Sequence, residues 1–429
     1  MNYKHTRIAC YTGYVTQAIV VNLAPLLFVI FQKDFKFSLS FIAAVTLITF
    51  LLQMGIDVAA IWFVERTSYR ALAVSSQLTA FVGLVMMAFL PRIMMPEAGL
   101  LLSVLVYSTG SGLCEVVLSP LIEAIPSEGD GKGSSMTLMH SFYAWGQAAV
   151  ILLTTVLLRF IGDGLWWIIP IVWSTIPLFN TLVFLKVPLA DMQVHEEGHS
   201  IGKMLCRPEF VVAFILMICA GAGEQAMAQW ASMFCEKGLG VSKLVGDILG
   251  PCMFAVMMGV GRTLHGLFGG RLSMYKLLAA LSAFTVACYF LTVFAPIPLV
   301  SLIFCGLAGF GVSVMWPGML ALCSSKYPAA GAAMFALLAL GGDIGCSVGP
   351  WLTGTVSDTV IKLSDTVAFI GDISIKTGLD TEQLGLRSGF LCAMVFPVLM
   401  LVGVIILSKS GKRSNEKQKD PGKGKGAVS

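Results

Sequence analysis

The sequence predicts an all-α, polytopic membrane protein with twelve transmembrane helices arranged in two halves of six. Hydrophobic residues make up 57% of the 429 residues, charged residues only 12%, and the mean hydropathy is +0.85. A single soluble core with a polar exterior cannot accommodate such a composition. Segments of about ten residues with alternating polarity, which a membrane β-barrel needs, do not occur in the chain.

Twelve apolar segments are each long enough to cross about 30 Å of hydrocarbon as a helix that rises about 1.5 Å per residue. Glycine and proline inside them are tolerated in a membrane, because neighbouring helices satisfy the freed backbone groups. The first six segments are 8–31, 39–64, 71–93, 98–125, 135–160 and 165–187. The other six are 210–235, 244–268, 274–294, 299–323, 329–356 and 387–407.

Lysine and arginine lie mainly on the side of the chain ends when the twelve segments are threaded through a membrane. The one long loop on the opposite side carries only Lys362 and Lys376. The positive-inside rule therefore predicts an N-in, C-in protein of the plasma (inner) membrane. The first segment follows Lys4 and Arg7 but is too long for a cleaved signal, so we expect it to remain as a helix.

Four regions follow from this reading of the chain. Residues 1–187 form the N-terminal six-helix half and residues 209–408 form the C-terminal half. The polar segment 188–208 is expected to be a cytoplasmic central loop. Residues 409–429 contain almost no apolar side chains, so we expect a disordered basic tail that is weakly attracted to anionic lipid.

Several functional classes are excluded by what the sequence lacks. The eleven cysteines are scattered singly, with no CxxC pair and no Cys/His cluster, so we expect neither a metal site nor disulfides. No Walker-type glycine-rich loop occurs, and no catalytic motif is apparent, so we expect neither ATP hydrolysis nor another enzyme activity. The net charge of +4 arises mainly from the tail and cytoplasmic loops and does not indicate nucleic-acid binding.

Each half carries a similar short basic loop after its second span. The loops read IWFVERTSYR (61–70) and GLFGGRLSMYK (266–276), and Arg66 and Arg271 lie about half the chain apart, as a duplicated six-span unit predicts. Both loops resemble the motif G-x-x-x-D-R-x-G-R-[RK] of the major facilitator superfamily. The resemblance implies that family's fold of two six-helix halves, and a gating or structural role for Glu65, Arg66, Arg70 and Arg271.

Four further segments are similar to the fucose:proton symporter group of sugar permeases within that superfamily. They read GSGLCEVVLSPLIEAIP (110–126), LMHSFYAWGQ (138–147), GAGEQAMAQW (221–230) and GGDIGCSVGPW (341–351). The resemblance implies that Glu115 couples transport to protons and that Gln147, with His140, binds sugar. The chain departs from the fucose transporter in its first span, which contains no acid.

Three carboxylates lie inside apolar segments, where a charge is costly unless it faces a polar cavity or a partner: Glu115, Glu224 and Asp343. Ser111, Glu115 and Ser119 are spaced at i, i+4 and i+8 and therefore share one face of a helix. We predict that the three acids exchange protons during transport. A structural ion pair or hydrogen bond is the alternative for Glu115 and Glu224, and close helix packing is the alternative for Asp343.

Polar and aromatic side chains near these acids are candidates for binding a small polar substrate. Amides form hydrogen bonds with hydroxyl groups, and tryptophan faces stack on sugars, although tryptophans also simply fill helix bundles. The predicted substrate-binding residues are Tyr14, Gln17, His140, Gln147, Gln225, Gln229, Trp230 and Trp316. For His140 an ordinary interfacial position is the alternative. Asp57 and Arg262 are charged residues towards the cytoplasmic side of their spans, and we predict gating or structural ion pairs for both.

These observations predict a secondary active transporter, with proton-coupled uptake of a sugar or similar small polar organic solute by alternating access. The proton is the only coupling ion we expect, with no cofactor. The expected partners are the substrate and membrane lipid, and the expected state is a monomer. Proton-driven efflux of drugs or metabolites is an alternative, although segment 135–160 lacks a G-P-x-x-G-G-like antiporter signature. A non-transporting receptor on the same fold is a further alternative.

Overall fold

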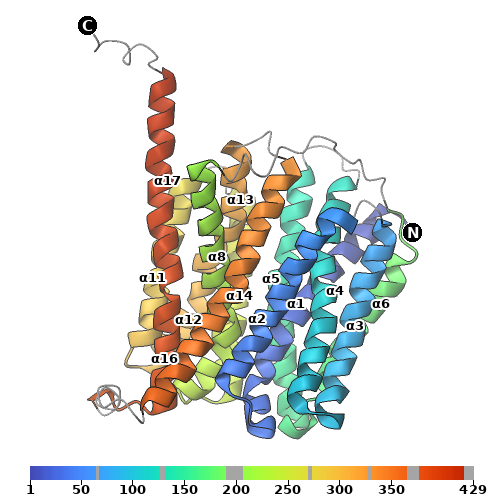
Figure 1. The fold of residues 1–429 in the computed structure, drawn as a ribbon, viewed down its shortest axis with the longest axis vertical. Coiled ribbons are helices and arrows are strands. Elements are labelled where there is room, and N and C mark those ends of the chain that lie inside the picture. Colours follow the sequence, from blue (N-terminus) through green and yellow to red (C-terminus); the bar gives the residue numbers. More distant parts are fainter. Residues whose placement is uncertain are drawn as a thin grey trace.

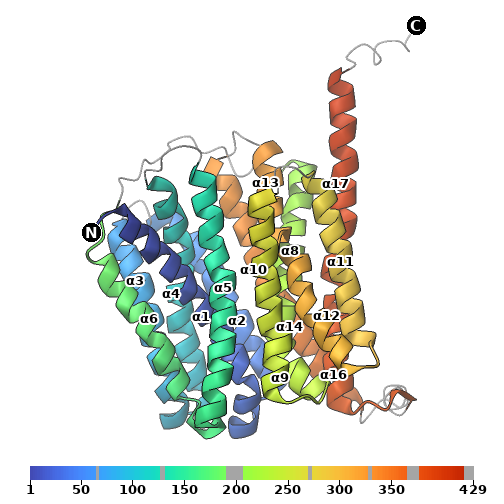
Figure 2. The ribbon, with the colours of Figure 1, turned by 180° about the vertical axis from the view of Figure 1, so that it is seen from behind.

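A computed structural model of the chain describes residues 1–63, 67–125, 131–189, 206–268, 273–326, 331–364 and 376–419. The described residues form helices and contain no strand. Most helices run roughly parallel to one another in a single bundle (Figures 1 and 2). The first helix begins and the last helix ends at the same end of this bundle, as an even number of spans requires.

The N-terminal half is built from six long helices. Two of them begin at side-chain caps, because Asn2 accepts a hydrogen bond from the backbone N–H of Lys4 and Ser68 accepts one from that of Ala71. The helices are α1 (Tyr3–Phe35), α2 (Leu39–Phe63), α3 (Tyr69–Ile93), α4 (Pro96–Ala124), α5 (Gly131–Ile161) and α6 (Ile168–Phe184), with the short 3-10 turn η2 (Asp163–Leu165) before α6.

In the C-terminal half several predicted spans consist of two or three helical pieces in series. The pieces within residues 208–268 are α8 (Pro208–Met233), the π-turn η3 (Phe234–Gly238), α9 (Lys243–Asp247), the π-turn η4 (Ile248–Cys252) and α10 (Met253–Phe268). They are followed by α11 (Met274–Phe294), α12 (Pro298–Val312), α13 (Met315–Lys326), α14 (Gly331–Ser364), α16 (Thr381–Ala393) and α17 (Val395–Lys419). The interruption between α12 and α13 leaves the carbonyl of Ser313 at a helix end, where it has no partner in a regular ladder.

Every predicted apolar segment coincides with a helix or with helices in series. Within the described residues, ten helical stretches are long and apolar enough to cross a membrane, and Ile168–Phe184 is a shorter apolar helix. These helices indicate a multi-pass membrane protein. The count of twelve spans and the N-in, C-in orientation stay predictions. Most of the expected central loop lies outside the described residues, and α17 extends to Lys419, into the segment expected to be a tail.

The two halves meet mainly along two seams, and α1 also contacts α8. In the first, α2 packs beside α14, as Figure 1 shows. In the second, α5 packs against α9, η4 and α10 (Figure 2). We call these the α2–α14 seam and the α5–α10 seam. The polar groups described below lie on or between these two contacts, so the seams position the candidate site.

Small residues set the close packing of α8 against α14 inside the C-terminal half. A Cβ atom added at Gly349 of α14 would lie 2.7 Å from the Cα of Ala222 on α8, and one added at Gly345 would lie 2.8 Å from the Ala222 nitrogen. Both distances are too short for a real contact, so the two backbones can approach this closely only because these positions are glycine.

Candidate functional site between the two halves

The carboxylate of Glu115 on α4 is held by two glutamines from neighbouring helices. Gln17 of α1 donates a hydrogen bond to Glu115 Oε2 over 2.9 Å, and Gln53 of α2 donates to the same oxygen. Ser111, one turn earlier on α4, donates to Gln53 Oε1 over 3.3 Å. A carboxylate in the membrane interior needs such donors, and here two neighbouring helices of the N-terminal half, α1 and α2, supply them.

Two further acids meet across the α2–α14 seam. The carboxyl groups of Asp57 on α2 and Asp343 on α14 lie within hydrogen-bonding reach of each other, and Glu115 interacts electrostatically with both. Among the described residues, no donor reaches either oxygen of Asp57 or Oδ2 of Asp343. Two carboxylates this close repel each other unless they share a proton, so the contact is suited to holding a proton between the halves.

The other predicted acid, Glu224 on α8, forms an ion pair with Arg262 on α10. Arg262 Nη2 lies 3.2 Å from Glu224 Oε2 and 3.4 Å from Oε1, and both side chains are nearly buried. Arg262 Nε donates to the carbonyl of Ser313 over 3.3 Å, at the interruption between α12 and α13. The counter-charge that the sequence requires for Arg262 is therefore Glu224, from the same half.

Side chains of α5 and α1 face this ion pair from the N-terminal half. His140 interacts electrostatically with Arg262, and its ring packs edge-on against Tyr14 with 5.1 Å between centroids. The Tyr143 hydroxyl interacts electrostatically with Glu224 and Arg262 and accepts a hydrogen bond from Asn22 Nδ2 over 3.4 Å. The site thus combines charges from one half with ring and amide groups from the other.

Gln147 lies one helical turn beyond Tyr143 on α5 and is 1% exposed. Within the described part of the chain, neither its amide nitrogen nor its amide oxygen has a hydrogen-bond partner. A buried amide left without partners is costly. In native structures such a group usually bonds a water, an ion or a ligand. The Gln147 amide thus retains both its donor and its acceptor capacity within the described residues.

The two glutamines of α8 are already engaged with protein groups. Gln229 Nε2 donates to the carbonyl of Val21 on α1 and to Gln225 Oε1, each over 3.2 Å. The first of these bonds links the two halves. The adjoining cavity, lined by Val21, Thr49 and Gln229 among others, has a volume of only about 10 Å³. This cavity has room for about one water and none for a sugar.

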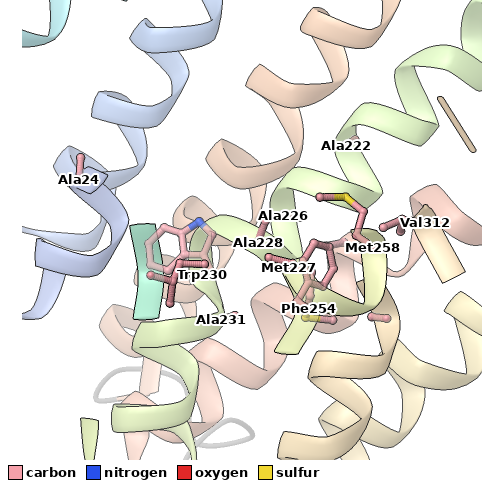
Figure 3. Close-up of a cluster of buried hydrophobic side chains, with 14 of the residues drawn as sticks. Ala24, Ala222, Ala226, Met227, Ala228, Trp230, Ala231, Phe254, Met258 and Val312 are labelled. Atoms are coloured by element: carbon pink, nitrogen blue, oxygen red, sulfur yellow. The ribbon is translucent and has the colours of Figure 1, made fainter. Parts of the chain in front are cut away.

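The predicted aromatic contacts are packed into the protein in this state. Trp230 is fully buried in the apolar cluster shown in Figure 3, and its Nε1 donates to the carbonyl of Pro350 over 2.9 Å. Its ring lies 6.2 Å from that of Phe28 on α1. Trp316 is partly buried and packs against Gly342, next to Asp343. Both rings therefore lie near the contact between the halves, and neither is free to stack on a ligand without a rearrangement.

Of the four loop residues predicted to have gating or structural roles, only Arg70 lies within the described residues. It donates three hydrogen bonds to the carbonyls of Phe184, Leu185 and Val187, over 2.8, 3.1 and 2.9 Å. These carbonyls end α6, where a positive charge is favourable. Arg70 therefore fixes the end of α6, in agreement with a structural role. Glu65, Arg66 and Arg271 lie outside the described residues.

Sequence reasoning missed the partners that complete the site. Gln53 was not singled out, although it lies one turn before Asp57 on the same helix. Tyr143 likewise lies one turn before Gln147, and this i, i+4 spacing is the signal that finds both residues. In the described residues no group of three or more His, Cys, Asp or Glu side chains is arranged to hold a metal ion.

A family model described as Major Facilitator Superfamily matches residues 10–350. The chain belongs to the Major Facilitator Superfamily. Membership of this superfamily indicates a transporter rather than an enzyme. No curated protein matches the sequence of this superfamily member.

Three solved transporters share its fold at low sequence identity. A bacterial homologue of the human lysosomal transporter Spinster, in an inward-facing and occupied conformation, is 14% identical, with a TM-score of 0.73 over 95% of this chain and 97% of that chain. The nucleoside transporter NupG is 12% identical, with a TM-score of 0.71 over 94% and 98%. The E. coli fucose:proton symporter FucP is 14% identical, with a TM-score of 0.61 over 95% and 99%.

Proposed function

We propose that this superfamily member is a proton-coupled importer of a sugar or similar small polar organic solute, working as a monomer in the inner membrane by alternating access. The observation that carries the proposal is the convergence of three acids from membrane-spanning helices on the contact between the halves. Glu115 and Asp57 come from the N-terminal half, and Asp343 comes from the C-terminal half. Acids in a membrane interior mark proton relays, and these lie where the halves must separate.

The groups around the acids favour a polar organic substrate. Gln147, whose amide is unpartnered in the described chain, lies one turn beyond Tyr143 on α5, and the Tyr143 hydroxyl interacts electrostatically with the Glu224–Arg262 pair. Such groups form directional hydrogen bonds with hydroxyl and carbonyl groups, whereas a site for a drug-like apolar molecule is lined mainly by apolar surface. The likeness in fold to a fucose:proton symporter is consistent with this choice.

The role of Glu115 is tested by separating exchange from accumulation. A thermal-shift screen of sugars, sugar acids and nucleosides first identifies a ligand, which is then labelled. In vesicles, Glu115→Gln mimics the permanently protonated acid, so it should still exchange labelled for unlabelled ligand. It should not accumulate ligand when a pH gradient is imposed, because the proton can no longer leave.

Glu97→Gln is the matched control, because Glu97 is an exposed acid in the first turn of the same helix. This variant should accumulate ligand as the wild type does. Full gradient-driven accumulation by Glu115→Gln would contradict the proposal for this residue. Accumulation only when the gradient is reversed would indicate efflux, and binding without exchange in the wild type would indicate a receptor.

A further inference from the structure

The Glu224–Arg262 ion pair lies at the contact between the halves but does not connect them. Both residues belong to the C-terminal half, on α8 and α10. The bonds that do cross between halves are different ones, such as Thr155 to Asp247 and Ser40 to Asp358. A gate must join the parts that separate, so a gating role does not account for this pair.

The geometry of the pair leaves part of the arginine unused. One nitrogen, Nη2, is shared between both carboxylate oxygens at 3.2 and 3.4 Å, whereas charge-assisted bonds are typically about 2.7–2.9 Å long and often use two parallel donors. Arg262 Nε donates to Ser313 O. Among the hydrogen bonds of the described residues, none is donated by Nη1. The guanidinium is thus fixed at a helix interruption and retains donors for a further acceptor.

We propose that Arg262 binds a carboxylate of the transported solute, and that Glu224 occupies the place of that carboxylate when the site is empty. The substrate class is then a hydroxylated organic acid, such as a sugar acid, rather than a neutral sugar. Its hydroxyl groups would pair with the unpartnered amide of Gln147 and with the Tyr143 hydroxyl. This inference rests on the proposed function and specifies its substrate.

The charges in the site then determine how a proton takes part. The empty site is neutral, because Arg262 and Glu224 cancel each other. A bound carboxylate neutralises Arg262 and leaves Glu224 as an unpaired charge in a dry environment, which is strongly unfavourable. Glu224 then takes one proton from water, forming an O–H bond, and the site is neutral again. Binding of one anion therefore takes up one proton.

Other titratable groups around the pair come from two packed helices. His140 and Tyr143 face it from α5, and Cys346 faces it from α14. Among the described contacts, none of them forms a hydrogen bond or ion pair with Glu224, so replacing that residue by glutamine breaks no bond of theirs. Loss of proton uptake in that variant would therefore identify Glu224 as the group that binds the proton.

The test uses matched pairs of probes: D-glucose with D-glucuronate, and D-galactose with D-galacturonate. Binding to purified wild-type protein is measured at pH 7 by calorimetry in two buffers of different ionisation enthalpy, which reports the number of protons taken up. We expect an acid, and neither neutral sugar, to bind with uptake of about one proton. In Glu224→Gln the same acid should bind about tenfold more tightly and without proton uptake, because the competing carboxylate is gone.

The double variant Arg262→Gln, Glu224→Gln removes both charges without leaving one unpaired, and it should lose binding of the acid. Arg92→Gln is the control, because the Arg92 guanidinium stacks on Trp167 away from the site; it should bind as the wild type does. Binding of the acid by the double variant, preference for a neutral sugar, or binding of no acid by either the wild type or Glu224→Gln would each overturn the inference.

The outcomes remain distinct from those of the proposed function. A neutral sugar that binds and is accumulated on a pH gradient would sustain proton-coupled uptake and refute the anionic substrate. An acid that binds through Arg262 but is never accumulated would sustain the anionic substrate and refute proton-coupled uptake.

Discussion

At the residue scale, the described chain contains two kinds of buried polar side chain. Some are fully paired, such as Gln77, whose amide oxygen accepts from Thr16 over 2.8 Å and from Asn180 over 3.2 Å. Gln147 is the contrasting case, because its amide is equally buried but has no partner within the described chain. A paired amide holds neighbouring helices together, whereas an unpartnered one leaves its hydrogen-bonding capacity for a further polar group.

The contrast gives a prediction with opposite signs for two similar substitutions. Gln147→Leu should raise the stability of the ligand-free protein by roughly 1–3 kcal/mol, because it removes an unsatisfied buried amide. It should also weaken ligand binding. Gln77→Leu should lower stability, because it leaves partners unpaired. Thermal unfolding in detergent with and without ligand measures both effects, and a destabilised Gln147→Leu protein would show that its amide is paired in the ligand-free state.

The sequence was sufficient to find the residues that are costly in a membrane, because a polar side chain in an apolar segment is visible by itself. Glu115, Glu224, Asp343 and Gln147 were found in this way, and all four lie near the contact between the halves. Their partners were not predictable, because the pairing of Asp57 with Asp343 depends on how α2 and α14 pack. Such contacts are separated by hundreds of residues along the chain.

At the element scale, each seam carries a bond between a hydroxyl and a carboxylate at the end of the bundle opposite the termini. Thr155 of α5 donates to Asp247 over 2.8 Å, and Asp247 pairs with Lys243 over 3.1 Å. In the α2–α14 seam, Ser40 donates to Asp358, which pairs with Lys362 over 2.8 Å. In both cases the N-terminal half supplies the hydroxyl, and the C-terminal half supplies the acid and its lysine.

Removing the hydroxyl from one seam should loosen that seam. Thr155→Val keeps the shape of the side chain but deletes a hydrogen bond to a buried carboxylate, worth about 1.5 kcal/mol or more. Hydrogen exchange of the backbone in residues 243–252 should therefore rise by roughly tenfold. Ser232→Ala is the control, because Ser232 donates to the same Asp247 from within the C-terminal half. Equal effects of the two variants would show that the Thr155 bond has no special role in holding the halves together.

The helices themselves followed from hydropathy, because every apolar segment of sufficient length must satisfy its backbone bonds internally. The interruptions inside the spans were not predicted, although a proline marks both of them. Pro317 lies four residues after Ser313, and Pro397 lies four residues after Ala393, where α16 ends. A proline cannot donate to the carbonyl four residues earlier, and its ring clashes with that carbonyl, so the helix is interrupted there. The partner of the freed Ser313 carbonyl, Arg262, could not be predicted, because it depends on how the helices pack.

At the scale of the whole molecule, the superfamily's two halves are expected to move as rigid bodies. Bonds in both seams then stabilise the same closed state. Thr155→Val should therefore raise hydrogen exchange in the α2–α14 seam as well as in the α5–α10 seam that carries it. Ser40→Ala, in the α2–α14 seam, should likewise raise hydrogen exchange in both seams. In the double variant the two factors should multiply, because the free energies add. Effects confined to the seam that carries each substitution would show that the seams open independently.

The glycines that join α8 to α14 have a mechanical consequence. Because Gly345 and Gly349 bring the two backbones into direct contact, the helices have no compressible layer of side chains between them at these positions. One of these helices carries Glu224 and the other carries Asp343. A displacement of about 1 Å at either acid would therefore be transmitted to the other helix with little loss. Replacing either glycine by a larger residue would push the two backbones apart and weaken this coupling, without changing either charge.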